Sequence, residues 1–294
     1  MYTEHLRIPV GVGFLHVERT GFGGPPVVLL HGFGTSAFLW RAIAPRLAEA
    51  GYTAVAVDLL GYGESERPAN ASYGVAIQAE YVARVLSALR LSDATIVGQD
   101  IGGLVALLLA AQRPSRVRQV ALVSPPDVDD LPGPDIRALQ RASARAALSS
   151  NALFGALPLL EPFLHSAVSE LHHMPDRLVG RYLAPFVGGD GVSHLLWLAS
   201  AIELSEEELS LLGQVRAPVL LVRGEGDQPG SVAGPSRLEA RLVGTVSTAV
   251  SIAHAGRLIA EDQPVALTAA LLAWWERAPI ARSYIEDEVT QRNR

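Results

Sequence analysis

One ten-residue stretch, Ala94 to Gly103, places a charged side chain between a short apolar run and an apolar helical pattern. Asp100 stands there in a Gly-x-Asp-x-Gly pattern, between Gly98 and Gly102. A sharp turn from strand to helix leaves little room for a Cβ atom at the neighbouring positions, so glycine is expected at both. The pattern therefore predicts that the Asp100 side chain is pushed outward at the end of a strand, beside the anion-favouring N-terminus of a helix.

Short apolar runs alternate with helical patterns along most of the chain. The predicted strands are residues 27–30, 53–57, 94–97, 117–123, 218–222 and 245–252. The predicted helices are residues 38–50, 75–90, 101–112, 232–242 and 264–277. This alternation predicts an α/β fold in which helices flank a mostly parallel central sheet.

The stretch from residue 126 to residue 213 differs from the rest, because it contains no clear strand. Its Leu, Ala and scattered Pro residues indicate several short helices instead. We therefore expect a core domain of residues 1–125 and 214–294, interrupted by an inserted helical cap of residues 126–213.

Composition narrows the chemistry and the partners. The chain has no cysteine and all 24 basic residues are arginine, which excludes thiolate metal sites, cysteine nucleophiles and lysine Schiff bases. A formal net charge of −6 without a basic run argues against nucleic-acid binding. The longest apolar stretch, residues 101–111, is too short to span a membrane. We expect a cytoplasmic protein without a cofactor or metal, with a small-molecule substrate and with a homodimer as an open alternative.

The chain resembles the α/β-hydrolase fold family from about residue 27 to residue 275, and within that family the branch that uses an aspartate nucleophile. The landmarks, in chain order, are the loop His31-Gly-Phe-Gly34, the loop Asp58-Leu-Leu-Gly-Tyr-Gly-Glu-Ser65, Asp100 at the strand-to-helix turn, Asp227 and His254. The family usually has glycine directly before its catalytic histidine, whereas this chain has Ala253 before His254.

The resemblance implies that Asp100 is a nucleophile. An ionised carboxylate can attack an sp³ carbon and form an alkyl ester on the enzyme. His254 would then deprotonate the water that hydrolyses this ester, and Asp227 would orient the imidazole, with Asp127 as the alternative acid. Attack on an ordinary ester would give a mixed anhydride, which argues against esterase, lipase and peptidase activity.

The leaving group distinguishes two kinds of relative. Dehalogenases of the family typically carry tryptophan directly after the nucleophile, where this chain has Ile101, and a further donor in the loop position of Phe33. Here the backbone N–H groups of Phe33 and Ile101 are the expected oxyanion donors. Epoxide hydrolases of the family protonate the opening oxygen with cap tyrosines; Tyr182 is the candidate here, with the N–H of Trp197 as an alternative.

Apolar side chains dominate the predicted cap and indicate a largely apolar substrate. The predicted substrate-binding residues are Phe33, Phe154, Phe163, Phe186 and Trp197. The resemblance thus implies an epoxide hydrolase that opens an apolar epoxide to a diol, with natural-product biosynthesis as its expected setting. The alternatives are a haloalkane dehalogenase with a non-standard halide site, and a non-hydrolytic binding protein, cyclase or isomerase on the same fold.

Overall fold

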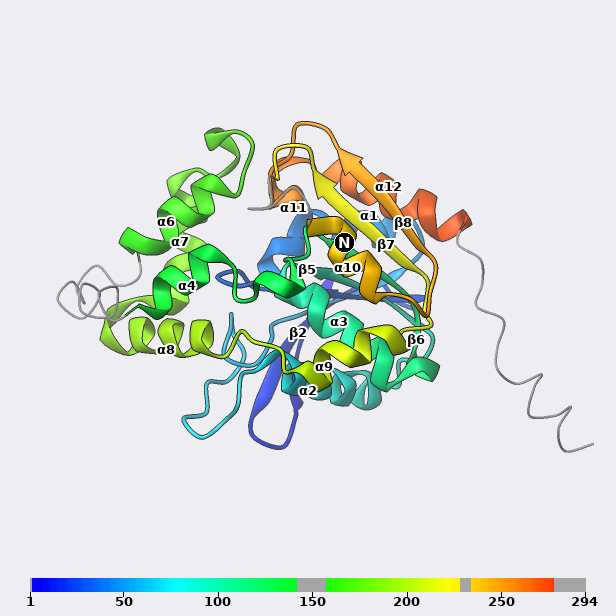
Figure 1. The fold of residues 1–294 in the computed structure, drawn as a ribbon, viewed down its shortest axis with the longest axis horizontal. Coiled ribbons are helices and arrows are strands. Elements are labelled where there is room, and N and C mark those ends of the chain that lie inside the picture. Colours follow the sequence, from blue (N-terminus) through cyan, green and yellow to red (C-terminus); the bar gives the residue numbers. More distant parts are fainter. Residues whose placement is uncertain (1, 142–156, 228–233, 278–294) are drawn as a thin grey trace, which may run out of the picture.

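A computed structural model describes residues 2–141, 157–227 and 234–277. The described strands form one eight-stranded sheet in the order β1-β2-β4-β3-β5-β6-β7-β8 (Figure 1). Their bounds are β1 Thr3–Pro9, β2 Phe14–Thr20, β3 Pro26–Leu30, β4 Thr53–Val57, β5 Ala94–Gln99, β6 Val117–Val123, β7 Val219–Gly224 and β8 Ser247–Ile252. The strands from β4 to β8 in this order run parallel to their neighbours, and only β2 pairs antiparallel, with β1 and β4. The predicted mostly parallel sheet is therefore confirmed.

Helices cover both faces of this sheet. They are α1 (Ala44–Glu49), α2 (Val75–Ala88), α3 (Ile101–Gln112), α10 (Gly234–Arg241), α11 (Ile259–Asp262) and α12 (Pro264–Arg277), with 3₁₀ turns at η1 (Ala37–Ala42) and η2 (Pro114–Arg116). Figure 1 shows α3 and α10 in front of the sheet, and α1 and α12 behind it. Helix α3 is buried from Ile101 to Ala110, which fits a helix packed between the sheet and α2.

In the described part of the segment between β6 and β7, the regular elements are helices, as expected. It contains η3 (Val128–Asp130), α4 (Pro134–Gln140), α6 (Leu157–Ser166), η5 (Leu171–His173), α7 (Asp176–Leu183), η6 (Ala184–Phe186), α8 (Gly188–Ser200), α9 (Glu206–Leu211) and η7 (Leu212–Gln214). We call this group the inserted helices. In Figure 1, α4, α6, α7 and α8 lie to one side of the sheet, whereas α9 returns to pack on α3. The expected domain boundaries at residues 126 and 213 stay a prediction.

Two local features differ from the sequence expectations. The sequence does not predict strands β1 and β2, because this edge hairpin mixes polar and apolar side chains and is buried only in part. The predicted helix over residues 38–50 is split into η1 and α1, because Pro45 has no N–H to donate to the preceding turn.

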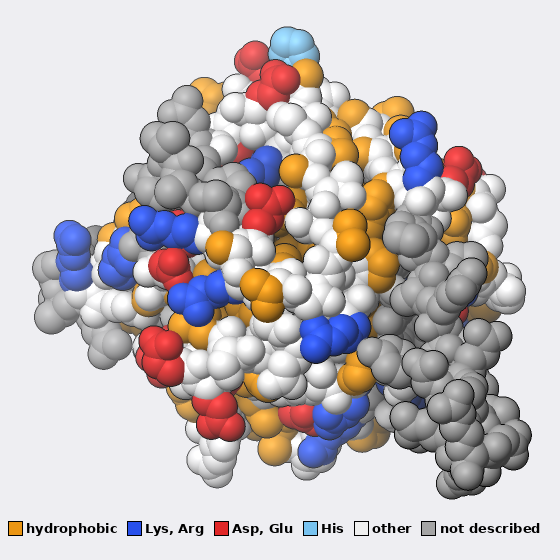
Figure 2. Space-filling model, turned by 45° about the vertical axis from the view of Figure 1, so that its right-hand side comes forward, with side chains coloured by type: hydrophobic (Ala, Val, Ile, Leu, Met, Phe, Trp, Pro, Cys, Tyr) orange, Lys and Arg blue, Asp and Glu red, His pale blue; other side chains and the backbone are white. Residues whose placement is uncertain are grey.

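On the face shown in Figure 2, acidic and basic side chains are interspersed and apolar side chains lie between them. None of the helices in the described ranges combines the length and the apolar character that crossing a membrane requires.

Candidate active site

The turn between β5 and α3 holds Asp100 in a strained conformation, with φ 51° and ψ −124°. Two close backbone approaches make this turn possible. A Cβ atom on Gly98 would lie 2.2 Å from the carbonyl oxygen of Gly102, and one on Gly102 would lie 2.5 Å from the carbonyl oxygen of His31. The glycines predicted to flank Asp100 are therefore required by the turn.

The carboxylate of Asp100 is held by the loop that follows β3. The backbone N–H of Phe33 donates to Asp100 Oδ2 at 3.0 Å. Burial raises the pKa of the Asp100 carboxyl above its usual range, and the negative charge of Asp227 acts in the same direction. The N–H groups of Phe33 and Ile101 and the positive charge of Arg257 lower this pKa without cancelling the rise. The N–H of Phe33, one of the two expected to stabilise an oxyanion, thus contacts the carboxylate of Asp100 itself.

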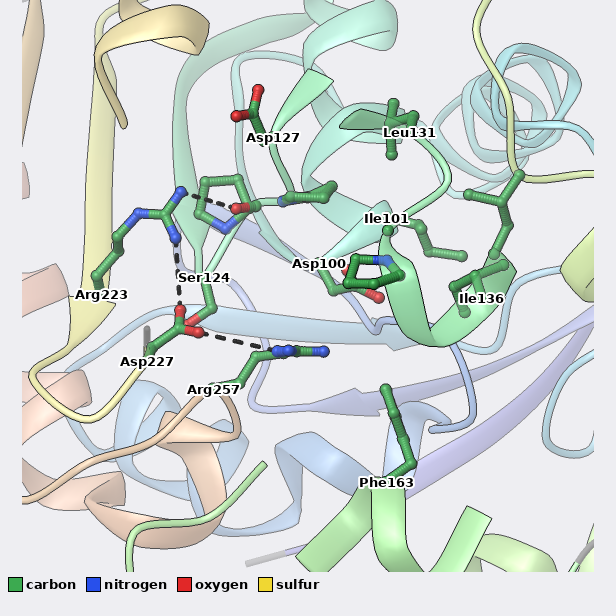
Figure 3. A pocket seen from close by; sticks show the side chains of 15 residues that line it. Asp100, Ile101, Ser124, Asp127, Leu131, Ile136, Phe163, Arg223, Asp227 and Arg257 are labelled. Carbon is green, nitrogen blue, oxygen red and sulfur yellow. Dashed lines mark hydrogen bonds and ion pairs between the residues drawn. The ribbon is translucent and has the colours of Figure 1, made fainter. Parts of the chain in front are cut away.

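Asp227 lies between two arginines (Figure 3). Its Oδ2 is 3.5 Å from Arg223 Nη1, and its Oδ1 is 3.8 Å from Arg257 Nε. Arg223 also donates from Nη2 to the carbonyl oxygen of Pro125 at 2.9 Å. The Asp227 side chain is 7% exposed, so this carboxylate is compensated mainly by guanidinium groups and little by water.

These charged groups line one pocket of about 100 Å³. Its charged lining residues are Asp100, Asp127, Asp227, Arg223 and Arg257, and its larger apolar ones are Ile101, Leu131, Ile136, Phe163 and Ile202. The pocket lies where the core meets the inserted helices, because Ile136 belongs to α4 and Phe163 to α6. It could hold a small, partly apolar molecule with a polar group directed at Asp100 and Arg257.

The structure does not bring His254 together with Asp100 and Asp227. The His254 residue is exposed and is not among those that line the pocket. Its φ is 54°, and its carbonyl oxygen accepts hydrogen bonds from Ser169 Oγ and Gln263 Nε2. His254 is therefore not placed to act as the base at this site, which corrects the expectation from the sequence.

Arg257 lines the pocket beside Asp227, where a catalytic triad would have its histidine base. Arg257 lies three residues after His254 in the loop that follows β8. In this loop Gly256 donates its N–H to Asp262 Oδ2 at 2.7 Å. A Cβ atom on Gly256 would lie 2.7 Å from the carbonyl oxygen of Ala167, so this position also requires glycine. The sequence contains the signal that identifies this position, because glycine precedes Arg257 whereas alanine precedes His254.

The two candidate proton donors lie outside the pocket lining. The Tyr182 hydroxyl donates to Glu261, whose carboxylate also accepts two hydrogen bonds of 2.6 Å from Arg41. Trp197 is 39% exposed and packs edge-on against Tyr73, with ring centroids 5.0 Å apart. Neither side chain is among the described residues that line the pocket.

Only some of the predicted substrate-binding residues lie at the pocket. Phe163 lines the pocket, and Phe33 packs edge-on against it with ring centroids 6.3 Å apart. Phe186 is buried beneath the guanidinium of Arg67 and does not line the pocket. Phe154 lies outside the described residues. Asp127, the alternative to Asp227 as the acid of the triad, also lines the pocket. The carboxylate next to Arg257 is that of Asp227.

The sequence model of the family described as alpha/beta hydrolase fold matches residues 25–264. The chain therefore belongs to the α/β hydrolase fold family, as the sequence resemblance implied. It is similar to a haloalkane dehalogenase of Mycobacterium marinum, with 27% identity over 287 residues that cover 92% of this chain and 90% of that protein.

Two further relatives are informative. Over 113 residues the chain is 41% identical to bifunctional epoxide hydrolase 2 of Sus scrofa, a match that covers 38% of this chain and 20% of that protein. The crystal structure of wild-type Cfl2 from Burkholderia cenocepacia superimposes with a TM-score of 0.80 and 28% identity, covering 92% of this chain and 95% of that one.

Proposed function

We propose that this protein is an α/β-hydrolase-fold enzyme that carries out proton transfer, an isomerisation or an intramolecular cyclisation, instead of hydrolysis through an ester on Asp100. In this proposal Asp100 is the reacting carboxylate, and Arg257 stabilises the negative charge that develops on a substrate oxygen. The main support for this proposal is the place of Arg257. It lines the pocket next to Asp227, where a catalytic triad would have its histidine.

An arginine cannot replace a histidine in ester hydrolysis. The guanidinium group stays protonated at any pH at which proteins fold, so Arg257 cannot take a proton from water. Asp227 is also a poor substitute, because Arg223 and Arg257 both approach its carboxylate. An alkyl ester on Asp100 would therefore lack the histidine base that activates the water in a catalytic triad.

Proton transfer matches the groups that are present. Asp100 would take a proton from a carbon next to a carbonyl group, and the electron pair of that C–H bond would move to the carbonyl oxygen as an enolate. The site keeps its total charge, because the negative charge passes from Asp100 to the substrate beside the fixed cation of Arg257. In an isomerisation, the protonated Asp100 returns the proton to a different carbon. In a ring closure, the enolate carbon attacks a second carbonyl carbon of the same substrate, the electron pair of that C=O bond moves to its oxygen, and Asp100 gives its proton to this oxygen.

The raised pKa of Asp100 supports this role. A carboxylate whose pKa lies above its usual range is, in its ionised form, a stronger base than an ordinary aspartate. The apolar side chains of Ile136, Phe163 and Ile202 favour a small, largely apolar carbonyl compound as the substrate.

Deuterium exchange tests this proposal. Phenylacetone, a small apolar ketone, would be incubated with the protein in D₂O, and loss of its benzylic protons would be followed by NMR. We expect Asp100→Asn to slow the catalysed exchange by about 100-fold or more, because general-base catalysis typically contributes that much. Arg257→Gln should also slow it, whereas Arg177→Gln, the same charge change at an exposed position, should not. Equal exchange with the parent protein and with Asp100→Asn would count against the proposal.

Epoxide opening is the second candidate. It is favoured by the N–H of Phe33, which holds Oδ2 of Asp100 and leaves Oδ1 to attack carbon, and by the similarity to proteins named epoxide hydrolase and haloalkane dehalogenase. Without a base, such a reaction would end at a stable ester on Asp100. The cytoplasmic location, the natural-product setting and the homodimer remain predictions, as does the role of the inserted helices as a cap over the pocket.

A further inference from the structure

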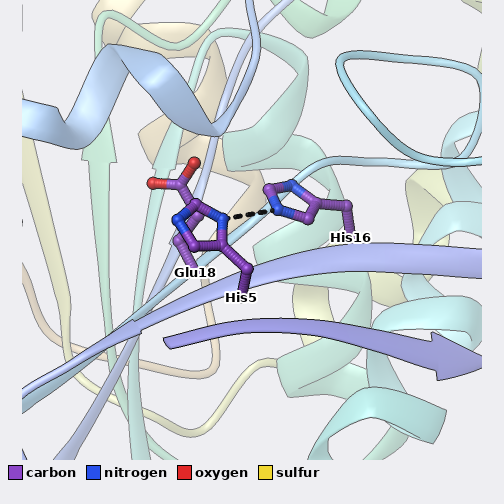
Figure 4. A group of neighbouring side chains, drawn as sticks. All are labelled: His5, His16 and Glu18. Atoms are coloured by element: carbon purple, nitrogen blue, oxygen red, sulfur yellow. Dashed lines mark hydrogen bonds between the residues drawn. The ribbon is translucent and has the colours of Figure 1, made fainter. Parts of the chain in front are cut away.

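Three potential metal ligands meet on the β1–β2 hairpin, several strands away from the pocket (Figure 4). His5 lies on β1, and His16 and Glu18 lie on β2. In the antiparallel register His5 is opposite Glu18, and His16 is two residues from Glu18 along the same strand. Paired residues and residues two apart share one face of a sheet, so the three side chains lie on the same face.

The distances between these groups are close to those of a metal site. His5 Nδ1 and His16 Nε2 are 3.0 Å apart, and the two rings stack with centroids 5.3 Å apart. One ligand atom from each of the three residues lies within 4.8 Å of the other two. Ligand atoms of a tetrahedral zinc site are about 3.3 Å apart, given Zn–N bonds of about 2.0–2.1 Å. A small movement of the Glu18 carboxylate would therefore complete the set.

His16 is already oriented as a metal ligand. Its residue is 5% exposed, and its Nδ1 is 2.8 Å from Oδ2 of the buried Asp58. Asp58 is itself fixed by the backbone N–H groups of Ala37 at 2.6 Å and Glu64 at 3.0 Å. A carboxylate on one histidine nitrogen sets the tautomer that leaves the other nitrogen available, which is the usual arrangement behind metal-bound histidine. Here that other nitrogen is Nε2, which faces His5.

The local charge also favours a cation. Asp58, Glu18 and Glu64 surround His16, and Glu64 Oε2 is 3.9 Å from His16 Nε2. Arg7 is opposite His16 in the hairpin, but its guanidinium lies over the ring of Phe14, 3.6 Å from the centroid.

We propose that His5, His16 and Glu18 bind a divalent transition-metal ion, Zn²⁺ in the first place, with water as the fourth ligand. On binding, the proton on His5 Nδ1 moves to Nε2 or to solvent, so that Nδ1 and His16 Nε2 both offer lone pairs. The ion would join β1 to β2 at the edge of the sheet. Sequence spacing gives no indication of such a site, because antiparallel pairing brings the ligands together.

Isothermal titration calorimetry with ZnCl₂ tests the site, on metal-stripped protein without a polyhistidine tag. We expect one Zn²⁺ per chain, and binding weakened at least about tenfold in His5→Ala and in Glu18→Gln. His172→Ala removes an exposed histidine elsewhere and should bind as the parent protein does. His16 is left unchanged, because it is buried against Asp58 and its replacement would disturb the fold.

Cobalt gives a second measurement that does not depend on enzyme activity. Co²⁺ added to the parent protein should produce the intense visible absorption of a tetrahedral site, and His5→Ala should lose it. Absence of stoichiometric Zn²⁺ binding, or equal affinity in the parent protein and His5→Ala, would overturn the proposal. Because no substrate is involved, this result is independent of the function proposed for Asp100.

Discussion

Asp100 combines a charged group, a desolvated environment and a backbone conformation that few residues adopt. Its φ of 51° favours glycine, asparagine or aspartate, and its carboxylate is buried against Phe33. Burial raises its pKa, so the ionised carboxylate is less favourable in the native state than in the unfolded chain and costs stability at neutral pH. This is the balance expected where a protein gives up stability to keep a reactive group in place.

We predict that Asp100→Asn stabilises the protein at pH 7 by on the order of 1 kcal/mol. Asparagine tolerates the same φ, can still accept the N–H of Phe33, and carries no charge to desolvate. The stability contributed by a neutral Asp100 is complete below its unfolded pKa and is lost as pH rises through the raised folded pKa. The advantage of asparagine should therefore be largest at neutral pH and shrink as the pH falls.

Urea unfolding of both proteins at a series of pH values measures this difference. The same series on Asp176→Asn, an exposed aspartate at the start of α7, is the control. A less stable Asp100→Asn protein at pH 7 would contradict the assignment of a desolvated carboxylate.

For single residues, the sequence predicts where the carboxylate of Asp100 lies but not which side chain lies beside Asp227. Asp100 can be identified because Gly98 and Gly102 mark a turn that few sequences allow. His254 is the candidate that residue type selects, whereas the backbone after β8 turns Arg257 toward Asp227. Residue type alone cannot show which side chain of a turn enters a pocket, because φ and ψ decide this.

The element that positions the site is the β5–α3 turn, and its glycines provide a stability test. We predict that Gly102→Ala lowers the free energy of unfolding by about 3 kcal/mol, because the new Cβ atom would meet backbone oxygens that cannot move aside. Gly180→Ala is the matched control. Gly180 lies within α7, where an added Cβ atom would meet open space, so alanine there should raise stability by about 0.5–1 kcal/mol.

Urea unfolding measures both changes. A Gly102→Ala protein as stable as the parent would show that the turn is looser than the distances to the carbonyl oxygens of His31 and Leu30 indicate.

Elements buried on both faces are predicted best from the sequence. Residues of β4 and β5 are buried throughout and are mostly apolar, and the predicted bounds of the buried helix α3 match the structure. The β1–β2 hairpin escapes prediction, because its outer face carries polar side chains such as His5 and Glu18 and the apolar pattern is incomplete. A sequence pattern can indicate burial, but it does not show pairing between edge strands.

Across the whole molecule, polar contacts tie the inserted helices to the core. Tyr182 of α7 donates to Glu261 of α11, which pairs with Arg41 of η1. Asp262 accepts from the N–H of Ser169 at 2.9 Å and lies 2.6 Å from His173 Nδ1. These contacts fix the inserted helices next to the loop that carries Arg257.

We predict that Tyr182→Phe leaves phenylacetone exchange unchanged and lowers the free energy of unfolding by about 1 kcal/mol, the usual contribution of one hydrogen bond. Glu261 stays paired with Arg41, so no buried charge is left alone. The exchange rate and urea unfolding would be measured on the same preparation. A large loss of exchange with unchanged stability would instead assign Tyr182 a catalytic role.

Asp262→Ala should affect stability and the site together. The substitution leaves the buried N–H of Gly256 without its carboxylate, at a cost of about 1–3 kcal/mol, and also removes the partner of the Ser169 N–H. Because Gly256 precedes Arg257, we expect slower phenylacetone exchange as well as a lower urea midpoint. Unchanged values for both would show that Asp262 does not support the Arg257 loop.

Because Arg257 cannot act as the base of ester hydrolysis, styrene oxide should not be turned over to its diol. Diol would be measured by chromatography, and the intact protein mass would report an ester. We predict that the parent protein forms no more diol than Asp100→Asn does, and that any adduct on Asp100 persists. Multiple turnovers to diol by the parent protein, abolished in Asp100→Asn, would contradict the account.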